Sequence, residues 1–96
     1  MTLSFQDFVP YRNTIFRAAE AEGYEFELAE LTDHSNAQLE QFSLIFACPT
    51  LPWLPQGTYT FVHPNMAEVI LFLVPVGPKG NAMCYESVFS RFVKTG

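Results

Sequence analysis

The chain has few cationic side chains: its 96 residues include 5 lysines and arginines against 10 aspartates and glutamates, a formal net charge of −5. The excess lies before residue 41, where eight acidic residues stand against Arg12 and Arg17. Nucleic acids and anionic membrane surfaces attract basic patches, and this chain lacks one. We therefore expect no nucleic-acid partner.

Long apolar segments are also missing. The longest apolar run, residues 69–76, has the length of a strand and contains Pro75, whereas a membrane-spanning helix needs about 20 residues. Asp7 stands where a secretion signal would continue its apolar stretch. We therefore expect a cytoplasmic protein with no membrane insertion.

Cysteine and histidine are scarce, with Cys48, Cys84, His34 and His63 as the whole set. A zinc site needs three or four converging ligands, and no CxxC or HxxxH spacing occurs here. Both cysteines lie in apolar, strand-like segments, which favours reduced, buried and unreactive thiols; a disulfide between them remains geometrically possible. We expect no metal and no cofactor, and we interpret His63 as a structural residue that bonds the backbone at a turn.

Apolar residues make up 49% of the chain and include 10 phenylalanines, enough to build a core. No repeat or linker divides the sequence, so we expect a single domain over residues 1–96. Short apolar segments separated by proline and glycine predict a mainly β fold. The expected architecture is a small six- to seven-stranded antiparallel barrel or compact sandwich, with a short N-terminal helix that Ser4 caps and Pro10 ends.

Alternation of apolar side chains places the strands. It predicts a hairpin over residues 14–21 and 24–31 that turns at Glu22-Gly23. A helix over residues 12–22 is the alternative, because "RAAEAE" has high helix propensity. The remaining strands are expected over residues 40–48, 58–63, 67–76 and 82–89.

The segments between these strands are polar or rich in proline and glycine. We expect loops over residues 32–38 and 77–81, a proline-rich loop after Cys48, and a tight turn at Pro64-Asn65. Residues 67–76 carry apolar side chains on both faces. This pattern predicts a central strand that is buried on both sides.

Four sequence words occur in order along the chain: FSLIF, LPQGTYTFVHP, LFLVPVGP and YESVF. With these words the chain resembles a bacterial family of short proteins that is classed as a domain of unknown function, over about residues 3–90. The resemblance implies a small, mostly β domain with no established activity and no catalytic residues. It also implies an association with gene neighbourhoods of phage-tail-like and tail-collar proteins.

The carboxylates give little indication of catalysis. Glu25 and Glu27 fall on one face of a predicted strand, as on a solvated face, and the spacing of an EF-hand is absent. Glu86 lies within an apolar strand. It is either an outward-facing carboxylate or, in the interior, a partner of Arg91 or Arg17.

The sequence CPTLPWLPQG is the best candidate for a functional segment. Its prolines frame Leu51, Trp53 and Leu54, which predicts a rigid apolar protrusion, and tryptophan is enriched at the energetic centres of protein interfaces. Large exposed apolar patches are unusual on monomers. The alternative is therefore that Trp53 folds back as a lid on one end of the barrel.

These observations favour a non-enzymatic β-barrel module for assembly or interaction, accessory to a phage-tail-like or surface-appendage complex. It would bind a protein partner or a second copy of itself through Leu51, Trp53 and Leu54. A small-molecule-binding barrel is the alternative, suggested by the many phenylalanines. An enzyme that uses Glu86 or His63 is the third hypothesis; we assign no catalytic residue.

Overall fold

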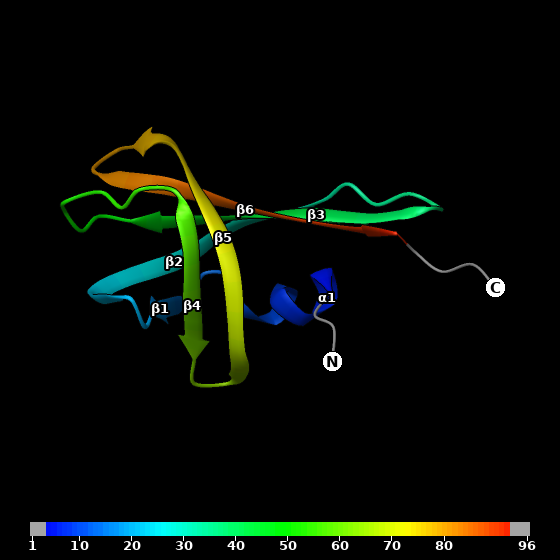
Figure 1. Ribbon diagram of the computed structural model, residues 1–96, viewed down its shortest axis with the longest axis horizontal. Helices are drawn as coiled ribbons and strands as arrows, with labels where there is room; N and C mark the ends of the chain where they lie inside the picture. The colour runs from blue at the N-terminus through cyan, green and yellow to red at the C-terminus, as the bar shows by residue number, and fades with distance from the viewer. Residues whose placement is uncertain (1–3, 93–96) are drawn as a thin grey trace.

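Six antiparallel strands close into a barrel in the computed structural model, which describes residues 4–92 (Figure 1). The order around the barrel is β1-β2-β3-β6-β5-β4, and β4 pairs back onto β1. The strand bounds are β1 Ile15–Ala18, β2 Ala21–Asp33, β3 Leu39–Cys48, β4 Gly57–His63, β5 Met66–Lys79 and β6 Ala82–Phe92. The predicted mainly β, antiparallel barrel is confirmed.

A short helical segment precedes the strands. α1 (Phe5–Phe8) is followed by a 3-10 turn (Val9–Tyr11) that contains Pro10. At the start of α1 the backbone N–H of Ser4 donates to Asp7 Oδ2 at 2.7 Å. Within residues 4–92, no helix has the length and apolar character needed to cross a membrane.

Aromatic rings fill the interior of the barrel. Alternation points one face of each strand inward, and this places four phenylalanines and a tyrosine from five strands side by side: Phe16, Phe26, Phe46, Phe61 and Tyr85. Their ring centroids lie 4.9 to 6.3 Å apart, and each ring is at most 1% exposed. Such offset and edge-to-face contacts stabilise the barrel beyond simple area burial.

The two ends of the barrel are built differently. At one end β3 and β6 extend together beyond the rest of the sheet, and α1 lies beside this extension (Figure 1). Phe8 of α1 packs there against Phe42 and Phe89, whose rings stack at 4.5 Å. At the other end β3 leads into the proline-rich segment before β4, which we call the proline loop (residues 49–56).

The first hairpin differs from its prediction. The chain turns at Ala19-Glu20, and Gly23 lies inside β2 with a positive φ of 88°. β1 pairs Ala18 with Ala21 and Phe16 with Phe26, so the register shifts and β2 bulges between those positions. The predicted turn at Glu22-Gly23 is wrong because glycine here permits a bulge; the alternative helix over residues 12–22 is wrong as well.

β5 also departs from its prediction. Its inward residues are buried, but Ile70 and Phe72 on the outer face are 67% and 52% exposed, so the strand is not buried on both sides. The strand continues through Gly77 and Pro78 to Lys79 by means of a register shift, and only Gly80-Asn81 forms the turn. The expected loop over residues 77–81 is therefore too long, whereas the Pro64-Asn65 turn is confirmed.

Candidate interaction surface

The backbone of the proline loop is held by hydroxyl groups from three different strands, β2, β4 and β6: those of Tyr24, Tyr59 and Tyr85. Tyr24 donates to the carbonyl of Pro52, and Tyr59 donates to the carbonyl of Pro55 at 2.7 Å. The backbone N–H of Leu54 donates to Tyr85 Oη at 2.9 Å. The loop is therefore fixed over one end of the barrel.

The three predicted contact residues do not share one environment. Leu54 packs against the core cluster, whereas Leu51 is 69% exposed and Trp53 is 45% exposed. Leu54 thus turns back toward the barrel, whereas Trp53 keeps nearly half of its surface exposed. Leu51 and Trp53 therefore both expose apolar surface on a fixed loop.

Two of the tyrosines that hold this loop, Tyr59 and Tyr85, have a pKa raised above the ordinary value of 10.0. Burial raises the pKa of Tyr59, and the negative charge of Glu20 raises it further. Burial also raises the pKa of Tyr85, against an opposing hydrogen bond from Leu54. The raised pKa of Tyr59 keeps on its hydroxyl the proton that it donates to the Pro55 carbonyl.

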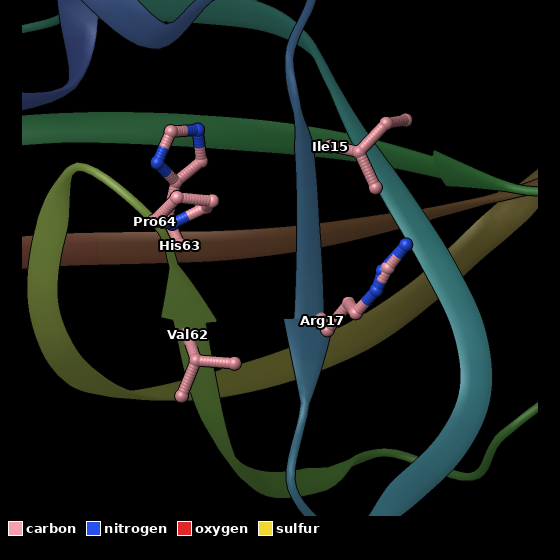
Figure 2. A pocket seen from close by; sticks show the side chains of 5 residues that line it. All are labelled: Ile15, Arg17, Val62, His63 and Pro64. Carbon is pink, nitrogen blue, oxygen red and sulfur yellow. The ribbon is translucent and has the colours of Figure 1, made fainter.

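A groove of about 500 Å³ lies outside the barrel wall where β1 and β4 meet. Figure 2 shows β1, which carries Ile15 and Arg17, beside the end of β4, where Val62, His63 and Pro64 complete the lining. In this view the side chains of Ile15 and Arg17 extend away from β4. The guanidinium of Arg17 is already paired with Glu25, at 2.7 Å. The groove is therefore mainly apolar, with one neutralised ion pair at its rim.

His63 has both ring nitrogens engaged. Nδ1 accepts the backbone N–H of Asn65 at 3.0 Å, and Nε2 lies 3.1 Å from Thr14 Oγ1. Since the Thr14 hydroxyl donates to the Tyr11 carbonyl, Nε2 carries the ring proton and donates to Thr14. The ring packs against Tyr11 and Phe16 with centroids 4.8 and 4.7 Å away. The predicted hydrogen bond between His63 and the backbone of its turn is confirmed.

The two cysteines are free thiols on opposite faces of neighbouring strands. β3 and β6 pair Cys48 with Met83 and Ala47 with Cys84. Cys48 points into the core and is fully buried, while Cys84 faces outward and is partly covered. Because successive side chains alternate across a sheet, the two sulfur atoms do not meet. The reduced state predicted for both is confirmed, whereas the predicted burial is confirmed for Cys48 and wrong for Cys84, which lies on the outer face.

The remaining predicted positions lie apart from one another. Glu86 is on the outer face of β6, opposite Ile45 and Val74, which confirms the outward-facing interpretation. His34 is exposed in the loop after β2. Within the described part of the chain, no three His, Cys, Asp or Glu side chains are grouped so as to hold a metal ion.

A contact that sequence reasoning missed joins Glu20 to Thr60. Glu20 Oε1 and Oε2 accept the backbone N–H and the hydroxyl of Thr60, each at 2.7 Å. These hydrogen bonds lower the pKa of Glu20. The contact ties the turn after β1 to β4 where the barrel closes, and no local pattern in the sequence signals it, because 40 positions separate the two residues.

Over residues 3–89 the sequence matches the family described as a domain of unknown function, DUF6916. The chain belongs to this family. Membership in DUF6916 confirms the resemblance seen in the sequence words and covers all six strands but the end of β6. A search of the curated proteins and a search of the solved structures found no match. The role of this DUF6916 chain is therefore argued from its surfaces.

Proposed function

We propose that this DUF6916 chain is a non-enzymatic interaction module that contacts a protein partner through Leu51 and Trp53 of the proline loop. The observation that carries the proposal is the fixed loop, whose backbone three tyrosine hydroxyls hold while these two apolar side chains stay exposed. A loop that is already ordered loses little conformational entropy on binding. An exposed tryptophan on such a loop supplies a typical interface anchor.

The environments of three side chains that could serve in catalysis favour this proposal over an enzyme. Both nitrogens of His63 are used within the fold, Cys48 is buried in apolar surroundings, and Glu86 stands on the outer wall opposite two apolar residues. Aromatic rings occupy the barrel interior, which disfavours an internal ligand cavity. We further infer an accessory role in a phage-tail-like or surface-appendage complex, which is supported by the sequence resemblance described above.

Small-molecule binding is a second candidate, favoured by the groove of Figure 2. Its volume of about 500 Å³ lies within the range of ligand pockets, and its lining is mostly apolar, as theirs is. Titration with an aromatic sulfonate, followed by amide NMR, tests it. Shifts centred on Ile15 and Val62 would support this candidate, and their absence would exclude this ligand class.

Site-specific photo-crosslinking tests the interaction proposal. A benzophenone amino acid is placed at Trp53 or Leu51, and at Glu68, an exposed residue of β5, as the control position. In the native host, illumination should yield a discrete adduct from the loop positions and none from position 68. Equal adducts at all three positions, or none, would contradict the proposal.

Light scattering after size-exclusion chromatography then separates the two kinds of partner. If the adduct has twice the mass of the chain, wild-type protein should run as a dimer and Trp53→Ala as a monomer. If the adduct contains another protein, both should run as monomers, and Trp53→Ala should lose the complex with that protein. Unchanged association after Trp53→Ala would contradict a contact centred on the loop.

A further inference from the structure

A second groove, of about 370 Å³, crosses the outer face of the barrel beside the proline loop. Its floor contains two small residues, Ala47 of β3 and Ala82 of β6, and Glu25 and Glu27 of β2 stand along one side. The first residues of the proline loop, 49–50, line it as well. The groove therefore adjoins Leu51, the residue that follows directly.

The strand register explains why a groove forms at this position. Ile15, Glu27 and Ala47 are directly paired across β1, β2 and β3. On β6 the direct partner of Ala47 is Cys84, and Ala82, two positions before it, continues the same outer face toward the proline loop. The small side chains of Ala47 and Ala82 leave room above this part of the sheet, and Gly23 of β2 lines the groove as well. Across these four strands the row spans roughly 14 Å, since strands lie about 4.8 Å apart; this is room for about four extended residues.

The charges along this groove are negative and partly uncompensated. Glu25 is paired with Arg17, but within residues 4–92 no cationic group lies within ion-pairing distance of Glu27. Glu22 and Glu30 are exposed on the same strand, and they add to the negative potential. A ligand that carries positive charge is therefore attracted to this face.

We propose that the groove binds an extended cationic segment of the protein that contacts Trp53, so that this partner is a basic protein and not a second copy of the chain. This inference rests on the proposed function, in which Trp53 is the apolar contact with the partner. The groove would add a charged contact beside it. Apolar centres flanked by complementary charges are the usual anatomy of protein interfaces.

Residues 4–92 of the chain itself are a poor source of such a segment. The chain carries a net charge of −5, and two copies of one acidic face repel each other. Arg17 and Arg91 are already in ion pairs. Arg12 and Lys79, the other cations among residues 4–92, lie far apart in the sequence and cannot form one short extended basic segment.

Amide NMR of the full chain with a defined probe tests the charge preference. The probe is a synthetic octapeptide that alternates lysine and serine, and the comparison peptide replaces lysine with glutamate. At low salt the lysine peptide should shift the amide signals of Glu27, Ala47, Thr50 and Ala82, and added salt should weaken its binding. No binding, or shifts spread equally over all acidic surfaces, would overturn the proposal.

Charge-reversed variants locate the site. Glu27→Lys should weaken binding of the lysine peptide by roughly fivefold or more, because it replaces an attraction by a repulsion. Glu68→Lys is the matched change at an exposed glutamate of β5 outside the groove. It should weaken binding of the lysine peptide by no more than about twofold. Equal effects of the two variants would overturn the assignment to the groove.

The same variants separate this inference from the proposed function. If the Trp53 crosslink forms with a basic protein and Glu27→Lys reduces it while Glu68→Lys does not, both stand. If the crosslink forms and Glu27→Lys leaves it unchanged, the loop contact stands and the groove inference fails. If no crosslink forms at Trp53, the proposed function fails, and the peptide titration still decides whether the groove selects cationic segments.

Discussion

Individual tyrosines explain how a segment so rich in proline is held in place. Proline has no backbone N–H, so neighbouring strands cannot pair with it regularly, and its carbonyl still needs a donor when it is covered. Tyr24 and Tyr59 supply that donor to Pro52 and Pro55. A tyrosine suits this place because its ring can pack in the core while its hydroxyl reaches the end of the barrel.

A single glutamate at the barrel seam makes stability depend on acid pH. Hydrogen bonds from Thr60 hold the pKa of Glu20 below its ordinary value of 4.5. A carboxyl whose pKa is lowered by folding stabilises the protein above the pKa of the unfolded chain, and this stabilisation is lost as the pH falls through the folded pKa. The Glu20 contribution should therefore be complete at neutral pH and decline below pH 4.5.

Glu20→Gln tests this contribution. The variant should melt at a lower temperature than wild type at pH 7, and the difference should shrink as the pH is lowered below 4.5, because wild type then loses the same charge. Thermal melts followed by circular dichroism at several pH values measure both effects. Glu68→Gln is the control and should match wild type throughout; a Glu20→Gln deficit that does not change with pH would point to lost packing instead.

At the scale of elements, the sequence predicts best where one face alternates without interruption. The strands expected over residues 40–48 and 58–63 appear as Leu39–Cys48 and Gly57–His63, because their inward side chains follow a strict period of two. The two errors of prediction both involve glycine. The sequence pattern places the first turn at Gly23 and ends β5 before Gly77. Both glycines have a positive φ and lie at register shifts. Because tight turns and bulges both favour glycine, the sequence does not distinguish between them.

Gly23→Ala tests whether the β2 bulge depends on backbone conformation. An added Cβ at Gly23 meets no atom within 4 Å, but its φ of +88° is rarely adopted by residues with a side chain. We expect a loss of about 1–2 kcal/mol in unfolding free energy from this strain. Urea denaturation followed by circular dichroism measures it.

Gly57→Ala provides the matched control for that measurement. The φ of Gly57 is not positive, and an added Cβ there makes only an ordinary contact, 3.9 Å from Tyr59. The control should lose less than about 0.5 kcal/mol. Similar losses in the two variants would mean that glycine at position 23 is not required by the bulge.

For the molecule as a whole, the sequence indicates which residues are apolar but not which of them the barrel encloses. The proline loop is identifiable from its composition, yet the outward position of Trp53 and the inward position of Leu54 depend on tyrosines from three distant strands. In the same way the sequence pattern predicts only that Glu27 is a solvated carboxylate. Its pairing with Ala47 across β2 and β3 places it beside a groove. Long-range pairing, which no local pattern encodes, decides both features.

The division between the enclosed and the exposed aromatic residues gives the last prediction. Phe61 of β4 is fully buried among other rings, whereas Phe72 on the outer face of β5 is 52% exposed. Phe61→Ala should cost about 3–5 kcal/mol of unfolding free energy, because it removes apolar contacts and leaves a cavity. Phe72→Ala should cost no more than about 1 kcal/mol, because water already covers half of that ring.

Urea denaturation of the two variants at several protein concentrations distinguishes a free outer face from a covered one. A small loss at Phe72 that does not change with concentration fits an outer wall that faces solvent in the isolated chain, and leaves the proline loop as the contact surface. A loss at Phe72 approaching that at Phe61, and growing with protein concentration, would show that a second copy covers β5. The groove beside Glu27 argues for a basic protein as the partner. Self-association through β5 would therefore count against a partner that is only a different protein.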